Sequence, residues 1–256
     1  MSLDQALQFV PTFVLVFFRV TGMMIFAPLF GSERIPRRVR LMLALVLSAG
    51  LSGVVKGPVA LPNQLWQLTL GIAGEMAFGL AMGMILSFTF IASQWAGEMI
   101  GQQMGLNMSE VLDPQFGSSG SLIGNMYFML TLVIFLLVGG HREMILGLKM
   151  SFQSLPLLSL GVDKPLLETL IGLLQSCTTL AMRLAAPVLV TMLIVDLALG
   201  CIGKAMPQMN VLTAGLSIRS LLGLGVVIVG LTLTVNVLSG SLLDAMHAVQ
   251  LRWASP

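Results

Sequence analysis

Long apolar runs restrict most strongly what this chain can fold into. Six of them are present, and they cover residues 9–30, 41–55, 68–95, 122–138, 184–202 and 216–238. Runs of about 18 or more apolar residues with few charges are typical of membrane-spanning helices. The composition agrees, because 56% of the residues are hydrophobic and 9% are charged. The sequence therefore predicts an all-α polytopic integral membrane protein with about six apolar helical segments, to which the stretch 145–180 could add an amphipathic or partly embedded pair.

Positive charges in the connecting segments predict the orientation of the chain. The densest group lies between the first two apolar runs and consists of Arg34, Arg37, Arg38 and Arg40. Because cytoplasmic loops carry an excess of Lys and Arg, we expect this segment and the one with Lys204 to be cytoplasmic, with both termini outside. The expected loop 96–121 would also be cytoplasmic, but it carries no Lys or Arg. The rule therefore has less force there.

Glycines at intervals of four residues predict close helix packing. Gly79 and Gly83 form one such pair, and Gly97, Gly101 and Gly105 form two consecutive steps. Small residues let helix backbones approach closely in a membrane. The second array is partly polar, so it either packs on neighbouring helices or lines an aqueous path. Packing within the chain is the simpler interpretation of each pair.

Four ionisable residues fall inside the apolar runs or beside them, and these are Arg19, Glu75, Arg183 and Asp196. A charge at the centre of a membrane helix costs about 2.5–3.5 kcal/mol on insertion scales, so each needs a partner or water. They either mark a transport pathway or pair with one another or with a neighbouring subunit. No relay-like spacing of Asp, Glu and His is present, which disfavours an ion-coupled transporter.

Motifs for chemistry are absent from the sequence. There is no metalloprotease HExxH, no phosphate-binding loop and no GxSxG elbow, and His141 and His247 are the only histidines. We therefore assign no catalytic, cofactor-binding or metal-ligating residue and expect no enzyme. Cys177 and Cys201 have apolar neighbours and are interpreted as core residues. A net charge of +2 without a basic stripe excludes a nucleic-acid partner.

The polar segment 105–121 is the most informative part of the chain. Asp113-Pro114 favours a turn, and residues 117–121 read Gly-Ser-Ser-Gly-Ser. Non-helical backbone at membrane depth is tolerated only where protein buries it or where it lines a water-filled cavity. A constriction in such a cavity is one possible use of this loop.

Several short motifs together resemble a known family. They are Ala96-Gly97-Glu98, Gln103-Met104-Gly105-Leu106, Asp113-Pro114, Gly139-Gly140-His141, Ala205-Met206-Pro207-Gln208-Met209-Asn210-Val211 and Gly215-Leu216, joined by Arg19, Pro28, Gly31, Pro36, Val39 and Arg40. With these motifs, nearly the whole chain resembles the FliR proteins of the bacterial flagellar export gate, which are related to the T subunit of virulence type III secretion systems.

The resemblance implies a single membrane-embedded domain over residues 1–256, built of bent helical hairpins within a larger helical hetero-oligomer. It implies assembly with FliP and FliQ in the inner membrane at the flagellar basal body, contacts with FlhB and FlhA, and passage of unfolded flagellar proteins. In the family, the loop that corresponds to residues 105–121 acts as a plug. FlhB is expected to wrap around the hairpin tip at Pro207, Gln208, Met209 and Asn210.

The family role of the loop carries over to Gly105, Asp113, Pro114 and Gly117 within it. Met104, Met108 and Phe116 are candidates for the seal, since flexible Met and a bulky aromatic can close a pore and repack around varied cargo. Ordinary packing of these three side chains is the alternative.

Three other functions remain open. A subunit of a virulence export system would share the architecture. A small-solute transporter would use sites on the third and fifth runs, but no internal repeat is visible. A membrane enzyme would use Glu75, Glu98 or His141, which show no convergent arrangement in the sequence.

Overall fold

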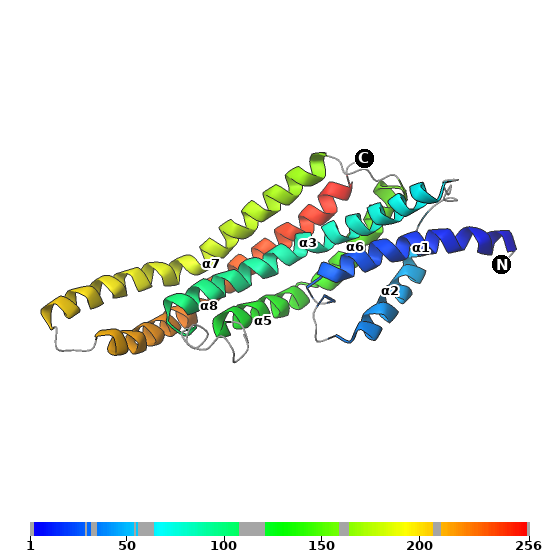
Figure 1. Cartoon of the computed structure of the whole chain (residues 1–256). Coiled ribbons are helices and arrows are strands. Elements are labelled where there is room, and N and C mark those ends of the chain that lie inside the picture. Colours follow the sequence, from blue (N-terminus) through cyan, green and yellow to red (C-terminus); the bar gives the residue numbers. More distant parts are fainter. Residues whose placement is uncertain are drawn as a thin grey trace. The chain divides into compact units, whose positions relative to one another are not determined.

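The computed structural model describes residues 3–28, 30–31, 35–53, 55, 64–107, 121–158, 164–206 and 211–254. Within these ranges it contains α-helices and no strands, so the all-α prediction is confirmed. The helices are α1 (Leu3–Phe26), α2 (Arg37–Ser52), α3 (Leu65–Gln103), α5 (Leu122–Leu137), α6 (Gly140–Ser154), α7 (Lys164–Ala205) and α8 (Val211–Ala254) (Figure 1).

Three of these helices are long and apolar enough to cross a membrane, namely α3, α7 and α8. A fourth candidate span is the pair α5 and α6, which are bent by 66° relative to each other. In the part of α1 whose side chains the structure describes, residues 10–26 form a shorter apolar helix, and α2 has 16 residues. The structure therefore supports a helical membrane protein, whereas the expected number of six spans is not confirmed.

Three helices are clearly longer than the apolar runs predict, namely α3, α7 and α8, the last of which covers Val211–Ala254 where the run covers 216–238. The expected loop from residue 96 is wrong at its start, because α3 continues to Gln103. Ala96, Ile100 and Met104 follow at intervals of four residues and are at most 1% exposed, so an apolar stripe continues the helix past the polar side chains. Likewise α7 begins at Lys164, well before the run at 184–202. The bend between α5 and α6 occurs at Gly139, whose φ of 78° suits glycine.

The chain divides into two compact units. Unit 1 comprises Met1–Phe88, Leu136–Leu174 and Leu242–Pro256, and unit 2 comprises Thr89–Phe135 and Gln175–Ser241. In unit 1, α1 packs against the first half of α3 through glycines. A Cβ atom at Gly79 would collide with the carbonyl oxygen of Arg19 and would lie 2.9 Å from the backbone nitrogen of Met23. The backbones therefore approach as closely as a glycine permits.

In unit 2, the last turns of α3 pack against α5. Phe90 meets Phe128 and Phe135 edge to face, with ring centroids 5.6 Å apart in each pair. The helices α7 and α8 run side by side as a long hairpin (Figure 1). The hairpin leaves many large apolar side chains exposed, among them Val190, Leu193, Ile194, Leu197, Leu221, Ile228 and Val229. Unit 2 therefore presents far more apolar surface than a water-exposed domain would.

Candidate functional site

A buried ion pair occupies the centre of unit 1. Arg19 Nε and Glu75 Oε2 are 2.5 Å apart, and both side chains are fully buried. Arg19 Nη1 also donates to the carbonyl oxygen and the hydroxyl of Ser151, each at 3.3 Å. The rings of Phe78 and Phe152 lie 4.8 and 4.6 Å from the guanidinium carbon. The guanidinium thus has a carboxylate, hydrogen-bond acceptors and two aromatic faces, which offset part of its desolvation. Its Nη2 atom has no hydrogen-bond partner among the described residues.

The second oxygen of Glu75 fixes the turn after α6. Its Oε1 accepts a hydrogen bond from the backbone nitrogen of Leu158 at 2.9 Å. Leu158 has a φ of 66°, a left-handed conformation that is unfavourable for a leucine, and its side chain packs on Gly71. Glu75 therefore connects α1, α3 and this strained turn. The geometry suits a structural clamp better than a transport pathway.

The other two predicted charges lie on α7 in unit 2. Asp196 Oδ1 pairs with Arg219 Nη2 of α8 at 2.6 Å, and both side chains are about one-third exposed. Arg183 is exposed, and it forms no ion pair within the described ranges. Sequence reasoning missed Arg219 as a partner. The sequence did contain a signal for this partner. Asp196 lies 11 positions before residue 207, and Arg219 lies 11 positions after residue 208, so the two residues are paired in an antiparallel hairpin centred on residues 207 and 208.

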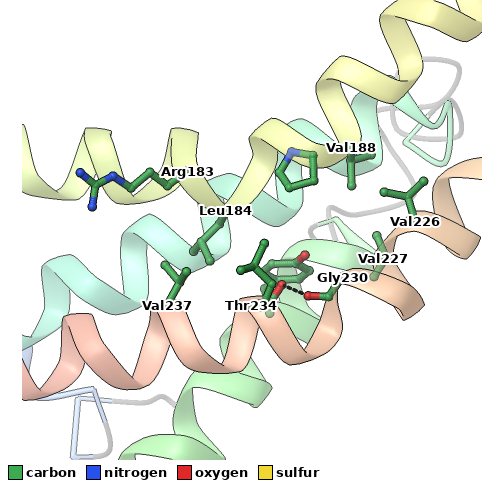
Figure 2. Close-up of a pocket in the computed structure, with 11 residues that line it drawn as sticks. Arg183, Leu184, Val188, Val226, Val227, Gly230, Thr234 and Val237 are labelled. Atoms are coloured by element: carbon green, nitrogen blue, oxygen red, sulfur yellow. Dashed lines mark hydrogen bonds between the residues drawn. The ribbon is translucent and has the colours of Figure 1, made fainter.

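A small cavity lies between α7 and α8, with a wall from α5. Its volume is about 20 Å³, and it is lined by Tyr127, Arg183, Leu184, Pro187, Val188, Val226, Val227, Gly230, Leu233, Thr234 and Val237. In Figure 2 the Arg183 side chain extends along α7, away from Thr234, whose hydroxyl donates to the carbonyl oxygen of Gly230 at 3.1 Å. A volume of this size accommodates about one water molecule. It is too small for a transported solute.

A larger groove opens between α3 and α7 in unit 2. Its volume is about 240 Å³, and it is lined by Trp95, Glu98, Met99, Gln102, Thr178, Ala181 and Met182. Gln94 Nε2 donates to Glu98 Oε1 at 3.0 Å. This groove brings an acidic side chain, two methionines and a tryptophan together. Glu98 is the member that sequence reasoning had connected with enzyme chemistry.

Met104 and Gly105 form the anchored start of the predicted plug loop. The helix α3 ends in a Schellman arrangement, in which Leu106 N bonds to Gly101 O and Gly105 N bonds to Gln102 O, both at 3.0 Å, while Gly105 has a φ of 76°. The carbonyl of Met104 accepts a hydrogen bond from the Ser220 hydroxyl at 2.9 Å. The Met104 side chain is 1% exposed and packs on Gly223 of α8.

The remaining predicted loop and tip residues lie outside the described residues. For the loop these are Met108, Asp113, Pro114, Phe116 and Gly117, and for the hairpin tip they are Pro207, Gln208, Met209 and Asn210.

The predicted packing glycines all lie against close neighbours. In unit 1, a Cβ at Gly83 would lie 2.5 Å from the Met23 carbonyl oxygen. In unit 2, a Cβ at Gly97 would lie 2.6 Å from the Cα of Gly124, and one at Gly101 would lie 2.7 Å from the Ser121 hydroxyl. The glycines of α3 therefore pack against segments of this same chain.

One cysteine differs from its predicted position. Cys177 is buried, but Cys201 is exposed, so its interpretation as a core residue was wrong. The reason is that Cys201 lies in the part of α7 whose apolar surface the chain itself does not cover. In the part of the chain that the structure describes, no group of three or more His, Cys, Asp or Glu side chains could hold a metal ion.

Comparison with known proteins identifies the family. Residues 10–245 match the family described as bacterial export proteins, family 1. The flagellar biosynthetic protein FliR of Aquifex aeolicus is 32% identical over 238 residues, which covers 93% of this chain and 92% of the relative. FliR of Bacillus subtilis is 29% identical, with 85% of each chain covered. The surface presentation of antigens protein SpaR of Shigella flexneri is 25% identical over 84% of this chain and 82% of the relative.

These matches extend over nearly all of the described helices, and the helices are of the length and composition that a membrane requires. The chain belongs to family 1 of the bacterial export proteins, the family of the FliR proteins, and is a membrane component of type III export.

Proposed function

We propose that the chain is a core subunit of the flagellar type III protein export gate. In this proposal it assembles with FliP and FliQ in the bacterial inner membrane at the flagellar basal body. It forms and closes the channel through which unfolded flagellar proteins leave, and it acts without catalysing a reaction of its own. The family match supports an export role, and the uncovered helices of unit 2 support assembly.

The single observation that carries the proposal is how little of the α7–α8 hairpin this chain buries. In the spanning windows of α7 and α8, 28% and 22% of the residues are buried, compared with 67% in α3. The hairpin also carries glycines at which a Cβ would meet nothing within 4 Å, namely Gly172, Gly200, Gly225, Gly230 and Gly240. Open small positions on apolar helices are typical of surfaces that receive another helix. Neighbouring subunits are therefore the natural cover for this surface.

Closure belongs, in this proposal, to the loop that follows Gly105. Its start is held by the Schellman turn and by Ser220. Its end is held at Ser121, whose hydroxyl accepts a hydrogen bond from the Gly124 backbone nitrogen at 3.3 Å. In this proposal the two anchors keep their positions when the gate opens. Met108 and Phe116 would supply the seal around exported chains, whereas the Met104 side chain is 1% exposed, packs on Gly223 and belongs to the anchor.

The connection between α7 and α8 is the proposed contact for FlhB. Its residues Pro207, Gln208, Met209 and Asn210 follow Lys204, which the charge rule assigns to the cytoplasmic side. FlhA is proposed as a further cytoplasmic partner of the gate. Membrane lipid is proposed to contact the apolar surface that the subunits leave uncovered.

The test is to purify the tagged chain in a gentle detergent after expression with its neighbouring membrane genes, followed by native mass spectrometry. We expect a stable hetero-oligomer that contains one copy of this chain with several FliP-like and FliQ-like subunits. Recovery as a monomer or a simple homodimer would contradict the proposal and favour the small-solute transporter.

A second candidate is a subunit of a virulence export system. The similarity to SpaR of Shigella flexneri, at 25% identity over 84% of this chain, favours it. The closer match to FliR of Aquifex aeolicus, at 32% identity, favours the flagellar role. Deletion of the gene decides between them, because loss of flagella is expected for the first role and loss of effector secretion with normal flagella for the second.

A further inference from the structure

A polar ladder on α3 faces the groove between α3 and α7. Gln94, Glu98 and Gln102 follow at intervals of four residues on this helix, so they lie on one side of it. Glu98 and Gln102 line the groove, while Gln94 donates its amide hydrogen to Glu98. The rest of the lining is mostly apolar, with Trp95, Met99 and Met182 among it. A single acidic group is thus set into an apolar groove of about 240 Å³.

Among the residues that the structure describes, Glu98 has a neutral hydrogen-bond donor, Gln94, but it takes part in neither the Arg19–Glu75 nor the Asp196–Arg219 ion pair. Its side chain lies beside Gly124 of α5, where an added Cβ atom would be 3.1 Å from the Glu98 Cγ. A carboxylate fixed within an apolar helix surface is costly in a membrane unless a cation or water reaches it. Since no printed ion pair gives Glu98 a cation, a paired cation would come from outside the described residues.

The adjoining segment of this chain is a poor source of that cation. Residues 108–120, which follow the end of α3, contain Glu110 and Asp113 and no Lys or Arg. Bringing them to Glu98 would add like charge and raise the cost. The apolar walls around Glu98 instead match the side chains of a membrane helix, which would bury Met99 and Met182 at the same time.

We propose that the groove between α3 and α7 is the docking site for a membrane helix of a neighbouring subunit, whose Lys or Arg side chain pairs with Glu98. This inference rests on the proposed assembly of the chain into a hetero-oligomer. Charge complementarity commits it to a basic helix. A second copy of this chain, phospholipid and the chain's own loop are the alternatives that the experiment separates.

The experiment places a photo-crosslinking amino acid in the groove of the assembled complex. Gln102 is the test position, and Gln103 is its matched control, because both are exposed glutamines at the end of α3 and only Gln102 lines the groove. After illumination, mass spectrometry identifies the crosslinked peptide. We expect position 102 to crosslink to a membrane helix of another subunit with a Lys or Arg within about one turn of the crosslinked residue, at a yield well above that of position 103.

Charge variants then test the pairing itself. Glu98→Gln keeps the hydrogen-bond geometry toward Gln94 but removes the charge, and we expect the crosslink at position 102 to fall about tenfold. Glu98→Lys should abolish it, and exchanging the basic residue of the partner for Glu should restore it. Restoration in the double variant separates a direct ion pair from a general disturbance of packing.

Several outcomes would overturn the inference while leaving the export function intact. In an assembled complex, one such outcome is an equal crosslinking yield at positions 102 and 103. Another is a crosslink from position 102 to phospholipid, to this chain's own residues 108–120 or to a second copy of this chain. A third is a crosslinked partner helix that has no basic residue. Recovery of the unmodified chain without any other subunit would overturn the proposed function and the docking site together.

Discussion

The Arg19–Glu75 pair illustrates how two charges can be stable within an apolar unit. Each group alone would face a large desolvation penalty, but here both are fully buried, 2.5 Å apart, and surrounded by further polar and aromatic partners. Replacing both members of such a pair by apolar side chains is often tolerated, whereas removing one leaves an uncompensated charge. The pair therefore acts as an all-or-none unit in the stability of unit 1.

We predict that Glu75→Gln lowers the free energy of unfolding by about 3–5 kcal/mol. The double substitution Arg19→Met and Glu75→Leu should cost much less than the sum of the two single changes, because it removes the buried charge altogether. Denaturant titration of the chain in mild detergent, followed by circular dichroism, measures these differences.

The matched control for that prediction is Asp196→Asn, at the pair with Arg219, in which both side chains are about one-third exposed. Since exposed ion pairs contribute little, we expect a change of less than about 1 kcal/mol there. Equal decreases in the free energy of unfolding for Glu75→Gln and Asp196→Asn would mean that burial does not determine the strength of these ion pairs.

At the scale of helices, glycines determine how closely the elements of each unit pack. Gly79 and Gly50 both lie within helices, but their surroundings are opposite. A Cβ at Gly79 would collide with the backbone of α1, whereas a Cβ at Gly50 would meet nothing within 4 Å. The same substitution should therefore have opposite signs at the two positions.

We predict that Gly79→Ala destabilises the chain by about 1–3 kcal/mol through overpacking between α1 and α3. Gly50→Ala should be neutral or stabilising by up to about 1 kcal/mol, since alanine favours the helix and has room. Thermal melts of the two variants in the same detergent provide the comparison. If Gly50→Ala lowered the melting temperature as much as Gly79→Ala, the result would argue against the close approach of α1 and α3.

Gly101 gives a prediction for unit 2. A side chain there would meet the Ser121 hydroxyl and the Asn107 side chain, which lie before α5 and after α3. Gly101→Leu should therefore disturb the two anchors of the plug loop, and we expect impaired assembly and loss of motility. The measurements are the steady-state level of the variant chain in membranes and the amount of it that is recovered together with other subunits. A motile strain with normal assembly would show that this side of α3 has room to spare.

The sequence predicted the helical class and several positions of close packing, but it could not predict which charges meet. Arg19 and Glu75 are separated by 56 positions, and nothing in their local sequence connects them. Asp196 and Arg219 were predictable in principle from the symmetry of the hairpin around positions 207–208. The end of α3 was placed too early because Glu98 and Gln102 interrupt the hydropathy, while Ala96 and Ile100 keep the buried stripe intact.

At the scale of the whole molecule, the two units differ in what they cover for themselves. Unit 1 contains the buried clamp of Arg19 and Glu75. Unit 2 contains the groove at Glu98 and the hairpin of α7 and α8, with its exposed apolar side chains. Much of the apolar surface of unit 2 is therefore left uncovered by the chain itself, in agreement with the proposed assembly. In that proposal, residues 105–121 are the part whose loss should affect closure of the gate without affecting the contacts between subunits.

Deleting residues 117–120 tests the plug within the assembled gate. These residues read Gly-Ser-Ser-Gly and follow the proposed seal residue Phe116, so the deletion shortens the loop while leaving its anchors at Gly105 and Ser121 in place. With residues 105–121 as the proposed plug, we expect an intact hetero-oligomer that makes the membrane leak ions, because the deletion removes part of that plug. Deletion of residues 57–60 between α2 and α3 is the control of equal length, and it should leave ion flux into vesicles unchanged. An assembled complex that lacks residues 117–120 and still keeps the membrane tight would assign closure to another part of the gate, and the search would then turn to Met104, whose anchored side chain the deletion leaves in place.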